Sequence, residues 1–206
     1  MKVNNFEELK KQLLNFSVDC REKYIPAIRP QTADILCDIV VKKQPHKILE
    51  IGTAGGCSGA LMLFANTNAF LTTIDINKDM CKLAEQTFAK YELSGRVKIE
   101  NADALEYLKN CKESFDFVFV DGPKGQYIKY WDYLKKLISK GGTIFCDDVL
   151  YFGMVLDDSK VIHKKITIVR NLREFINITK NDAEFESKLL DIEDGILILE
   201  KKLWQM

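Results

Sequence analysis

The sequence predicts a single α/β domain built on a doubly wound, mostly parallel sheet, and three observations lead to this fold class. Short apolar runs rich in β-branched and aromatic residues alternate along the chain with segments of helical periodicity. The 206 residues, of which 47% are hydrophobic, suffice for one domain with a sizeable core. The sequence also lacks internal repeats, low-complexity tracts and flexible linkers. We therefore expect one domain over residues 1–206.

Five apolar runs are the expected parallel strands, and several of the segments between them have the i, i+3, i+4 apolar spacing of amphipathic helices. The expected strands are Lys47–Thr53, Leu71–Ile76, Val97–Ala102, Phe115–Asp121 and Thr143–Asp147. The expected helices between them are Ser58–Asn66, Lys78–Tyr91, Ala104–Lys109 and Tyr127–Ser139.

Further elements are expected at both ends of this alternating region. Helices over Phe6–Lys23 and Thr32–Lys43 would form an N-terminal helical cover, residues 1–44, over a core of residues 45–206. After the fifth strand we expect one long helix and an antiparallel hairpin of two strands, at Lys164–Ile178, Lys188–Ile192 and Gly195–Lys201. The hairpin would complete a sheet of seven strands.

Composition and charge exclude several classes of protein. Lys plus Arg and Asp plus Glu each total 30, so no global field attracts nucleic acid or anionic membranes. The six cysteines form no CxxC pair, which argues against a zinc site or a disulfide framework. No signal peptide is evident, and no run approaches the roughly 20 apolar residues of a membrane span. We expect a cytoplasmic protein with no membrane partner.

A glycine-rich turn joins the first strand to the following helix in the segment KILEIGTAGGCSG. Glycines allow a ligand to approach the backbone, and the first turn of a helix offers unpaired amides to an anionic group. The dinucleotide fingerprint needs glycines at its first, third and sixth positions, but Ala54 and Cys57 occupy the last two after Gly52. An NAD-dependent oxidoreductase is therefore disfavoured.

Two later strand ends carry residues suited to an adenosine ligand. Asp75 closes the second strand, where a carboxylate can accept both hydroxyls of a ribose. Asp103 and Ala104 follow the third strand, where an adenine commonly lies. Each residue alone could equally belong to an ordinary turn or helix cap. Together with the glycine turn, they predict an adenosine site at the carboxyl edge of the sheet.

Five motifs follow one another along the chain: ILEIGTAGGCSG, the acid in TTIDIN, NADALEYL, FDFVFVDGPKGQY and GGTIFCDDVLYFGMV. In this order they resemble the motifs of the metal-dependent O-methyltransferases, the group that contains catechol and caffeoyl-CoA methyltransferases. Within this group, KGQY, VLYFGMV and the ending LLDIEDGILILEKK are most similar to bacterial tRNA 5-hydroxyuridine methyltransferases. The resemblance covers residues 25–201 and implies a Rossmann-like, S-adenosylmethionine-dependent enzyme that forms a homodimer.

The resemblance also assigns roles at the cofactor site. It implies that Glu50 and Gly52 line the methionine end of S-adenosylmethionine and that Ser58 holds its carboxylate. Asp75 would bind the ribose, and the residues after the third strand would lie beside the adenine. Asp121, at the end of the fourth strand, is also expected to contact the cofactor.

Three carboxylates follow adjacent strands and can converge on one edge of the sheet. Asp121 ends the fourth strand, and Asp147 and Asp148 end the fifth. Oxygen ligands suit Mg²⁺, Mn²⁺ or Ca²⁺ rather than zinc, and such an ion can lower the pKa of a bound hydroxyl. The resemblance makes Lys124 the candidate general base, with a pKa that the nearby ion would lower.

The sequence departs from the family pattern within this set. The family usually has Asn where Asp148 stands, and Gly122-Pro123 replaces a more common pair of small residues. The additional carboxylate would strengthen the attraction for a cation and could change the choice of metal. Alternatively, Asp148 is a solvated loop acid.

For the acceptor, the resemblance favours the 5-hydroxyl of a wobble uridine in the single-stranded anticodon loop of tRNA. Basic residues that could hold RNA phosphates are Lys160, His163, Lys164, Lys165, Arg170 and Arg173. Their charges alone fit the solvated face of a helix at least as well. Tyr127, Tyr151 and Phe152 are candidates for stacking on a base, or else core aromatics.

Two alternatives share the predicted adenosine site. One is a methyltransferase for small catechols or hydroxycinnamoyl thioesters, with the same cofactor and metal. The other is a non-catalytic adenosine-binding protein, in which replacing Lys124 would matter little.

Overall fold

The structure is a computed structural model that describes residues 3–203 and comprises two compact units, Met1–Ala104 and Leu105–Met206. Among the described residues there are seven strands, in the order β3-β2-β1 in the first unit and β4-β5-β7-β6 in the second. The predicted fold class is confirmed: the sheet is Rossmann-like and mostly parallel, with a C-terminal antiparallel hairpin.

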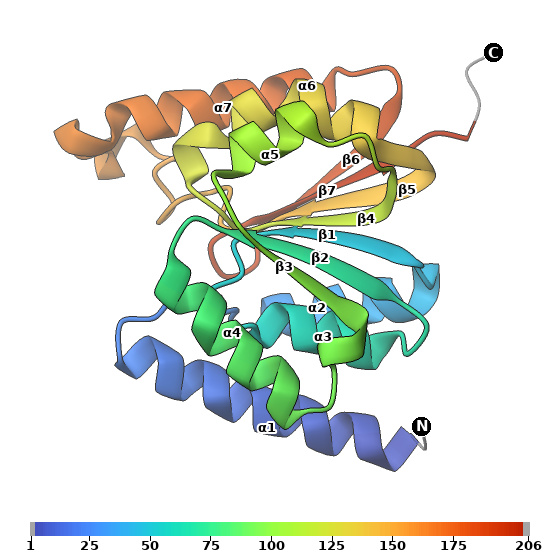
Figure 1. Cartoon of the computed structure of the whole chain (residues 1–206). Coiled ribbons are helices and arrows are strands. Elements are labelled where there is room, and N and C mark those ends of the chain that lie inside the picture. The colour runs from blue at the N-terminus through green and yellow to red at the C-terminus, as the bar shows by residue number, and fades with distance from the viewer. Residues whose placement is uncertain (1–2, 204–206) are drawn as a thin grey trace. The chain divides into compact units, whose positions relative to one another are not determined.

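The first unit contains three parallel strands and the helices that cover one face of them (Figure 1). Its elements are α1 (Val3–Glu22), α2 (Pro30–Lys43), β1 (Lys47–Ile51), α3 (Cys57–Ala65), β2 (Phe70–Asp75), α4 (Lys78–Lys90), η1 (Ser94–Arg96) and β3 (Val97–Asn101). Both α1 and α2 pack against α3, so the predicted helical cover is part of this unit.

Local sequence explains the limits of these helices. Pro30 is the first residue of α2, a position where its missing N–H costs no hydrogen bond. Gln44 ends α2 in the left-handed conformation, with φ of 48°, and its N–H donates to Val40 O at 2.9 Å. The Asn77 side chain caps α4 by accepting from the Asp79 amide at 2.9 Å.

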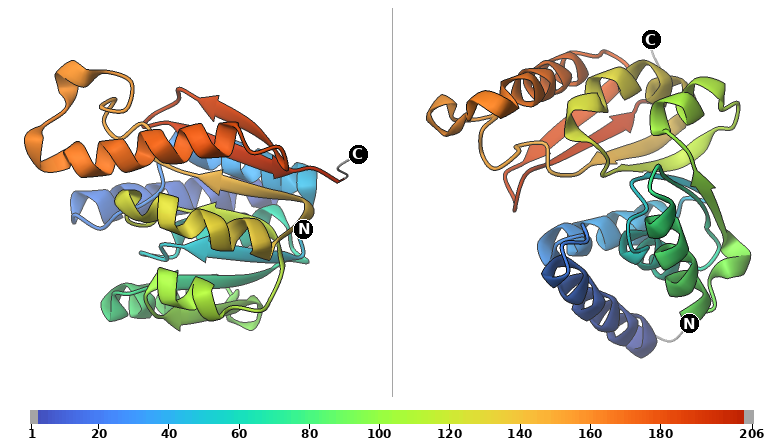
Figure 2. Two further views of the ribbon diagram at one scale, coloured as in Figure 1. Left: turned by 90° about the horizontal axis from the view of Figure 1, so that it is seen from above. Right: turned by 60° about the vertical axis from the view of Figure 1, so that its left-hand side comes forward.

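The second unit begins with α5, which starts at the unit boundary, and continues through four strands. Its elements are α5 (Ala104–Asn110), β4 (Phe115–Val120), η2 (Lys124–Gln126), α6 (Tyr127–Leu137), β5 (Ile138–Cys146), η3 (Asp158–Lys160), η4 (His163–Lys165), α7 (Ile166–Lys180), β6 (Phe185–Leu190) and β7 (Ile196–Lys201). The β4–β5 pair is parallel, and β7 pairs antiparallel with both β5 and β6. Helices α6 and α7 lie side by side (Figure 2). Trp131 connects α6 to this core through an edge-on contact with the Phe175 ring and a tilted contact with the Phe185 ring.

The boundary between α6 and β5 differs from the sequence prediction. The predicted helix Tyr127–Ser139 ends at Leu137, and β5 begins at Ile138, because Ile138 pairs with Phe115 of β4. The strand then passes through a register shift beside Gly142, where a Cβ would lie 2.9 Å from Asp116 O. The sequence prediction did not extend this strand back to Ile138, because two adjacent glycines precede its predicted start at Thr143.

The first strand of the terminal hairpin begins and ends earlier than predicted, whereas the second differs from its predicted range by one residue. Strand β6 begins at Phe185, which is buried and packs its ring against that of Trp131 at a centroid distance of 4.8 Å. Among the helices described, none is both long enough and apolar enough to cross a membrane.

Candidate functional site

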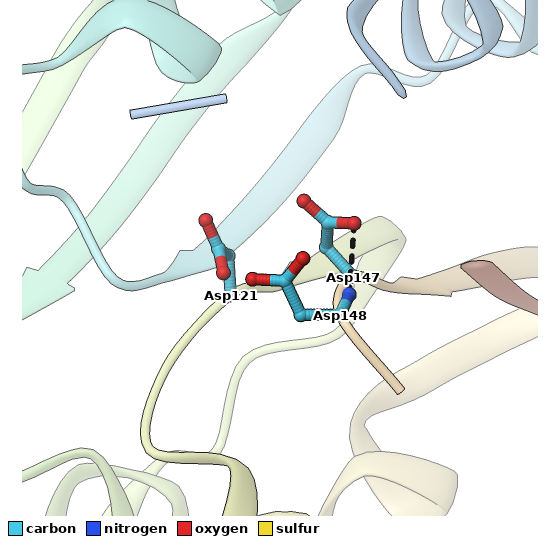
Figure 3. A group of neighbouring side chains, drawn as sticks. All are labelled: Asp121, Asp147 and Asp148. Atoms are coloured by element: carbon cyan, nitrogen blue, oxygen red, sulfur yellow. Dashed lines mark hydrogen bonds between the residues drawn. The ribbon is translucent and has the colours of Figure 1, made fainter. Parts of the chain in front are cut away.

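The three predicted metal ligands lie together in the second unit. Asp121 directly follows β4, and Asp147 and Asp148 directly follow β5, its parallel neighbour. One carboxylate oxygen from each residue lies within 4.8 Å of the others. Figure 3 shows the carboxylates of Asp121 and Asp148 turned toward each other.

Asp147 is the most enclosed member of this acidic cluster, with 4% of its surface exposed. Its N–H donates to Val120 O at 3.0 Å, and its Oδ1 accepts from the Asp148 N–H at 2.8 Å. Burial raises the pKa of the Asp147 carboxyl well above its ordinary value, and the charges of Asp121 and Asp148 raise it further. The positive charge of Lys124 lowers this pKa but does not cancel the shift. The cluster therefore favours the uptake of positive charge.

The Asp148 backbone adopts the left-handed conformation, with φ of 56°. Asp and Asn tolerate this conformation better than most residues with a Cβ, because their short side chains can bond locally. The turn is therefore compatible with both the Asp found here and the Asn of the family pattern. The backbone turn brings the carboxylates of consecutive residues to one place.

The donor set fits a hard divalent cation. Mg²⁺, Mn²⁺ and Ca²⁺ prefer carboxylate oxygens, and all three side chains of the cluster supply them. Lys124 can neutralise at most one of the three carboxylate charges. A divalent ion would compensate the remainder and would offset the cost of burying Asp147.

Lys124 lies in η2 and points its ammonium group into the cluster. Nζ donates to Asp121 Oδ1, lies 3.4 Å from Asp148 Oδ2, and donates to the Tyr127 hydroxyl at 3.1 Å. Burial alone lowers the pKa of Lys124, but the attraction of Asp121, followed by Tyr127 and Asp148, outweighs it and raises the pKa well above its ordinary value. The sequence predicted a lowered pKa for Lys124 on the assumption that a bound cation lies beside it. Such a cation would compete with Lys124 for these carboxylates.

The structure places Tyr127 in the core, which is one of the two alternatives that the sequence left open. It does not stack on a base, because only 1% of its surface is exposed. Its hydroxyl lies 3.0 Å from Val120 O and 3.1 Å from Asp147 O, and its ring meets Phe175 edge-on. Burial raises the pKa of Tyr127 well above its ordinary value, so the phenol keeps its proton. The sequence signal for its place beside Lys124 was its position three residues later, at the start of a predicted helix.

The predicted residues at the methionine end lie around the glycine turn of the first unit. Glu50 is fully buried, with Oε1 accepting from Ser58 Oγ at 2.5 Å and Oε2 accepting from Thr73 Oγ1 at 2.6 Å. The Thr73 hydroxyl also lies 2.6 Å from that of Thr53. The Ser58 proton is thus engaged by Glu50, and the hydroxyl must rotate before it can donate to a ligand carboxylate.

The remaining cofactor candidates lie in this turn, at the end of β2 and after the end of β3. Gly52 has φ of 100°, in the region that favours glycine, and its N–H donates to Ile74 O at 2.9 Å. Asp75 accepts from the amides of Ala54, at 2.9 Å, and Asn77, at 2.8 Å, so it stabilises the turn and keeps lone pairs for a ribose. Residues 103 and 104 come at the start of α5, where the aspartate is exposed and the alanine half-buried.

The predicted basic cluster is only partly available to a ligand. Arg173 donates to Val155 O at 2.9 Å and to Met154 O at 3.0 Å, and it also pairs with an aspartate in η3. Lys165 Nζ lies 5.5 Å from the centroid of the Tyr151 ring. The exposed members of the cluster are Lys160, His163, Lys164 and Arg170.

An aromatic turn follows the acidic cluster. Tyr151, Phe152 and Gly153 all have positive φ, at 48°, 58° and 71°, and the Phe152 side chain is 66% exposed. The Phe152 N–H donates to the carboxylate of Asp194, whose backbone O also accepts from the Leu150 N–H at 2.8 Å. The turn between β6 and β7 therefore holds the half-buried Tyr151 and the exposed Phe152 in a strained conformation.

The chain matches the model of the O-methyltransferase family over residues 4–202. Probable caffeoyl-CoA O-methyltransferase 1 of Dictyostelium discoideum is 24% identical over 200 residues, which cover 94% of this chain and 86% of that protein.

Two solved structures share the architecture. One, from Staphylococcus aureus, is described as a putative caffeoyl-CoA O-methyltransferase; it has a TM-score of 0.85 and 26% identity, covering 96% of this chain and 99% of that one. The O-methyltransferase TomG from Streptomyces achromogenes, solved in complex with SAM, has a TM-score of 0.80 and 23% identity, covering 92% of this chain and 89% of that one.

Proposed function

The chain belongs to the O-methyltransferase family, and on that premise we propose that it methylates an acceptor hydroxyl held beside Asp121, Asp147 and Asp148. The predicted enzyme class, an S-adenosylmethionine-dependent O-methyltransferase, is confirmed by the family match. The observation that carries the metal-assisted mechanism is the acidic cluster with Lys124 directed into it.

The proposed cofactor site is the glycine turn of the first unit. Gly52 lets a ligand approach the backbone, and Asp75 offers a carboxylate at the end of β2, where a ribose can bind. The start of α3, beside Ser58, would receive the carboxylate of the methionine moiety. TomG, which shares the fold, was solved with SAM, and this likeness supports the proposal.

The proposed metal ligands are the three aspartates of the acidic cluster. A bound divalent ion would orient the acceptor oxygen and lower the pKa of its hydroxyl. The aspartates hold this position at the ends of β4 and β5, and Asp147 is fixed through its own backbone and that of Asp148. Mg²⁺ is our first choice, with Mn²⁺ and Ca²⁺ as alternatives.

Lys124 is the proposed general base. Its neutral amine would take the proton from the acceptor hydroxyl, and the oxygen would form a bond to the methyl carbon in line with the departing sulfur. The carbon–sulfur bond breaks and its electron pair stays on the sulfur, which becomes a neutral thioether. Lys124 ends the step as an ammonium group, a form that Asp121 and Asp148 stabilise.

For the acceptor, we propose a hydroxyl next to a second oxygen on a flat ring. Two adjacent oxygens can share one hard cation, and a flat ring can stack on an exposed aromatic side chain such as Phe152. A 5-hydroxyuridine in tRNA and the ring of caffeoyl-CoA both have this chemistry. The name of the Dictyostelium relative supports the small thioester, whereas the exposed Lys164 and Arg170 support RNA.

The test is transfer of labelled methyl from S-adenosylmethionine to two acceptors in parallel: tRNA from cells lacking this protein, and caffeoyl-CoA. Lys124→Met is the matched control, because it keeps the length of the side chain and removes the base. Label in one acceptor that is lost in the variant supports the proposal and identifies the acceptor. Cofactor binding without transfer to either acceptor would refute both proposed acceptors.

We also propose that the protein is a homodimer, as the family resemblance implies. Exposed apolar side chains on α1 and α2, including Val18 and Val41, are available for such an interface. Sedimentation equilibrium at micromolar concentration measures the mass directly. A mass of one chain would refute the proposal.

A further inference from the structure

The Tyr127 hydroxyl connects three parts of the second unit at the acidic cluster. It accepts from Lys124 Nζ at 3.1 Å, and it lies within donating distance of Val120 O, at 3.0 Å, and Asp147 O, at 3.1 Å. The first carbonyl belongs to the last residue of β4 and the second to the residue after β5. The hydroxyl therefore ties the lysine to the two strand ends that carry the aspartates.

The single proton of this hydroxyl is directed away from Lys124. A phenol has one O–H to donate, and two carbonyl oxygens compete for it. The oxygen can then only accept from Nζ. When Lys124 is a neutral amine, Tyr127 would hold one of its two N–H groups and leave the nitrogen lone pair free to face the acceptor hydroxyl.

Tyr127 also differs from the other partners of Lys124. Asp121 and Asp148 are proposed metal ligands, so a bound cation would draw on the same oxygens that hold Nζ. The Tyr127 hydroxyl is outside the set of carboxylates, so a bound cation would not draw on it. It is thus the partner of Nζ best placed to act during catalysis.

The surroundings of Tyr127 make it a rigid support. Its ring packs edge-on against Phe175 of α7, with centroids 5.8 Å apart. The preceding turn is held by Asn171 of α7, whose side-chain amide donates to Gly125 O at 3.0 Å. A side chain locked in this way can fix the position of a longer, more flexible one.

We propose that Tyr127 is a positioning residue, which accepts a hydrogen bond from Lys124 Nζ and thereby aims the lysine lone pair at the acceptor hydroxyl. This inference rests on the proposed function, because it requires Lys124 to be the base. Tyr127 itself exchanges no proton with the acceptor in this scheme.

The test is a double-mutant cycle of Tyr127→Phe and Lys124→Met in the full-length protein, with caffeoyl-CoA as the acceptor, or tRNA if tRNA is the one methylated. Tyr127→Phe keeps the ring and its packing and deletes the hydroxyl. Tyr130→Phe is the matched control, since it makes the same deletion at a buried tyrosine on the same helix. All rates are measured below the onset of unfolding of every variant.

We expect Tyr127→Phe to lower kcat by about 10-fold, a part of the roughly 10²–10⁴-fold that a positioned base supplies. The acceptor KM and the cofactor Kd should stay within about 2-fold, and Tyr130→Phe should keep the kcat of the parent. In the Lys124→Met background, Tyr127→Phe should have no further effect on kcat, because there is no base left to position.

Three results would overturn the inference. One is a kcat for Tyr127→Phe within about 2-fold of the parent. Another is an equal loss of kcat in both backgrounds, which would indicate a structural role independent of Lys124. If Lys124→Met itself keeps full activity, the proposed general base is wrong and the positioning role falls with it.

Discussion

Replacing Gly195 with alanine is expected to destabilise the protein, because the turn between β6 and β7 has no room for a methyl group. A Cβ at this position would lie 2.2 Å from Leu150 Cγ and 2.8 Å from Leu150 Cβ. Gly195 also has φ of 86°, a backbone conformation that side chains rarely adopt. Its carbonyl accepts from the Val149 N–H at 3.0 Å, so the collision cannot be relieved without moving the loop after the acidic cluster.

The magnitude follows from these two costs. The positive φ contributes about 1–2 kcal/mol, and forcing a methyl group into a packed site contributes roughly 1–3 kcal/mol. The free energy of unfolding should therefore fall by about 2–5 kcal/mol, which corresponds to a decrease in Tm of about 5–15 °C for a chain of this length.

Thermal unfolding followed by circular dichroism measures this change. Gly95→Ala is the matched control, because a Cβ at Gly95 would meet nothing within 4 Å and its φ is not positive. That control should unfold within about 2 °C of the parent. If Gly195→Ala also unfolds within about 2 °C of the parent, the packing assigned to this turn is wrong.

Three further predictions concern buried polar groups and thiols. In EDTA, Asp147→Asn should become progressively more stable than the parent as pH rises from 4 to 8. The folded-state pKa of Asp147 is raised, so the carboxyl ionises in the unfolded state at a lower pH than in the native state, and the parent loses stability across that interval. A pH-independent difference in urea unfolding would contradict this. Ser58→Ala should weaken S-adenosylmethionine binding by about 5- to 30-fold, since it removes the hydroxyl proposed to bind the ligand carboxylate, which is also hydrogen-bonded to Glu50. Calorimetric titration measures this Kd. An unchanged Kd would remove Ser58 from the cofactor site. A thiol reagent should label the half-buried Cys111 well before Cys37, because burial raises the pKa of the Cys37 thiol to about 12. Peptide mapping would reveal the order of labelling. The reverse order would contradict the packing of α2.

Much of the fold could be predicted because hydrophobic periodicity reports local structure. The strands around Glu50, Asp75 and Asp121 follow from short apolar runs, and the position of each acid at a strand end follows from parallel topology. The convergence of Asp121, Asp147 and Asp148 was therefore accessible from the sequence.

Contacts between distant segments were not accessible in this way. Asp194 holds the Phe152 turn across 42 residues, and Arg173 contacts the backbone of Met154 and Val155. Nothing in the local sequence pattern distinguishes such an arginine from a solvated one. The sequence prediction therefore counted Arg173 among the charges available to RNA, although its side chain is hydrogen-bonded to the backbone. The sequence left Tyr127 open between a base-stacking and a core position for the same reason, because its burial depends on packing against α7.

The central claim is that the acidic cluster binds a divalent cation that methyl transfer requires. The most direct measurement is the initial rate of labelled methyl transfer to whichever of caffeoyl-CoA or tRNA is the acceptor, first after EDTA treatment and then after addition of Mg²⁺ or Mn²⁺. We predict that EDTA abolishes transfer, that the cation restores it in the parent protein, and that the same addition fails to restore it in Asp147→Asn. Full activity in EDTA, or equal restoration in the variant, would contradict the assignment of Asp121, Asp147 and Asp148 as a catalytic metal site.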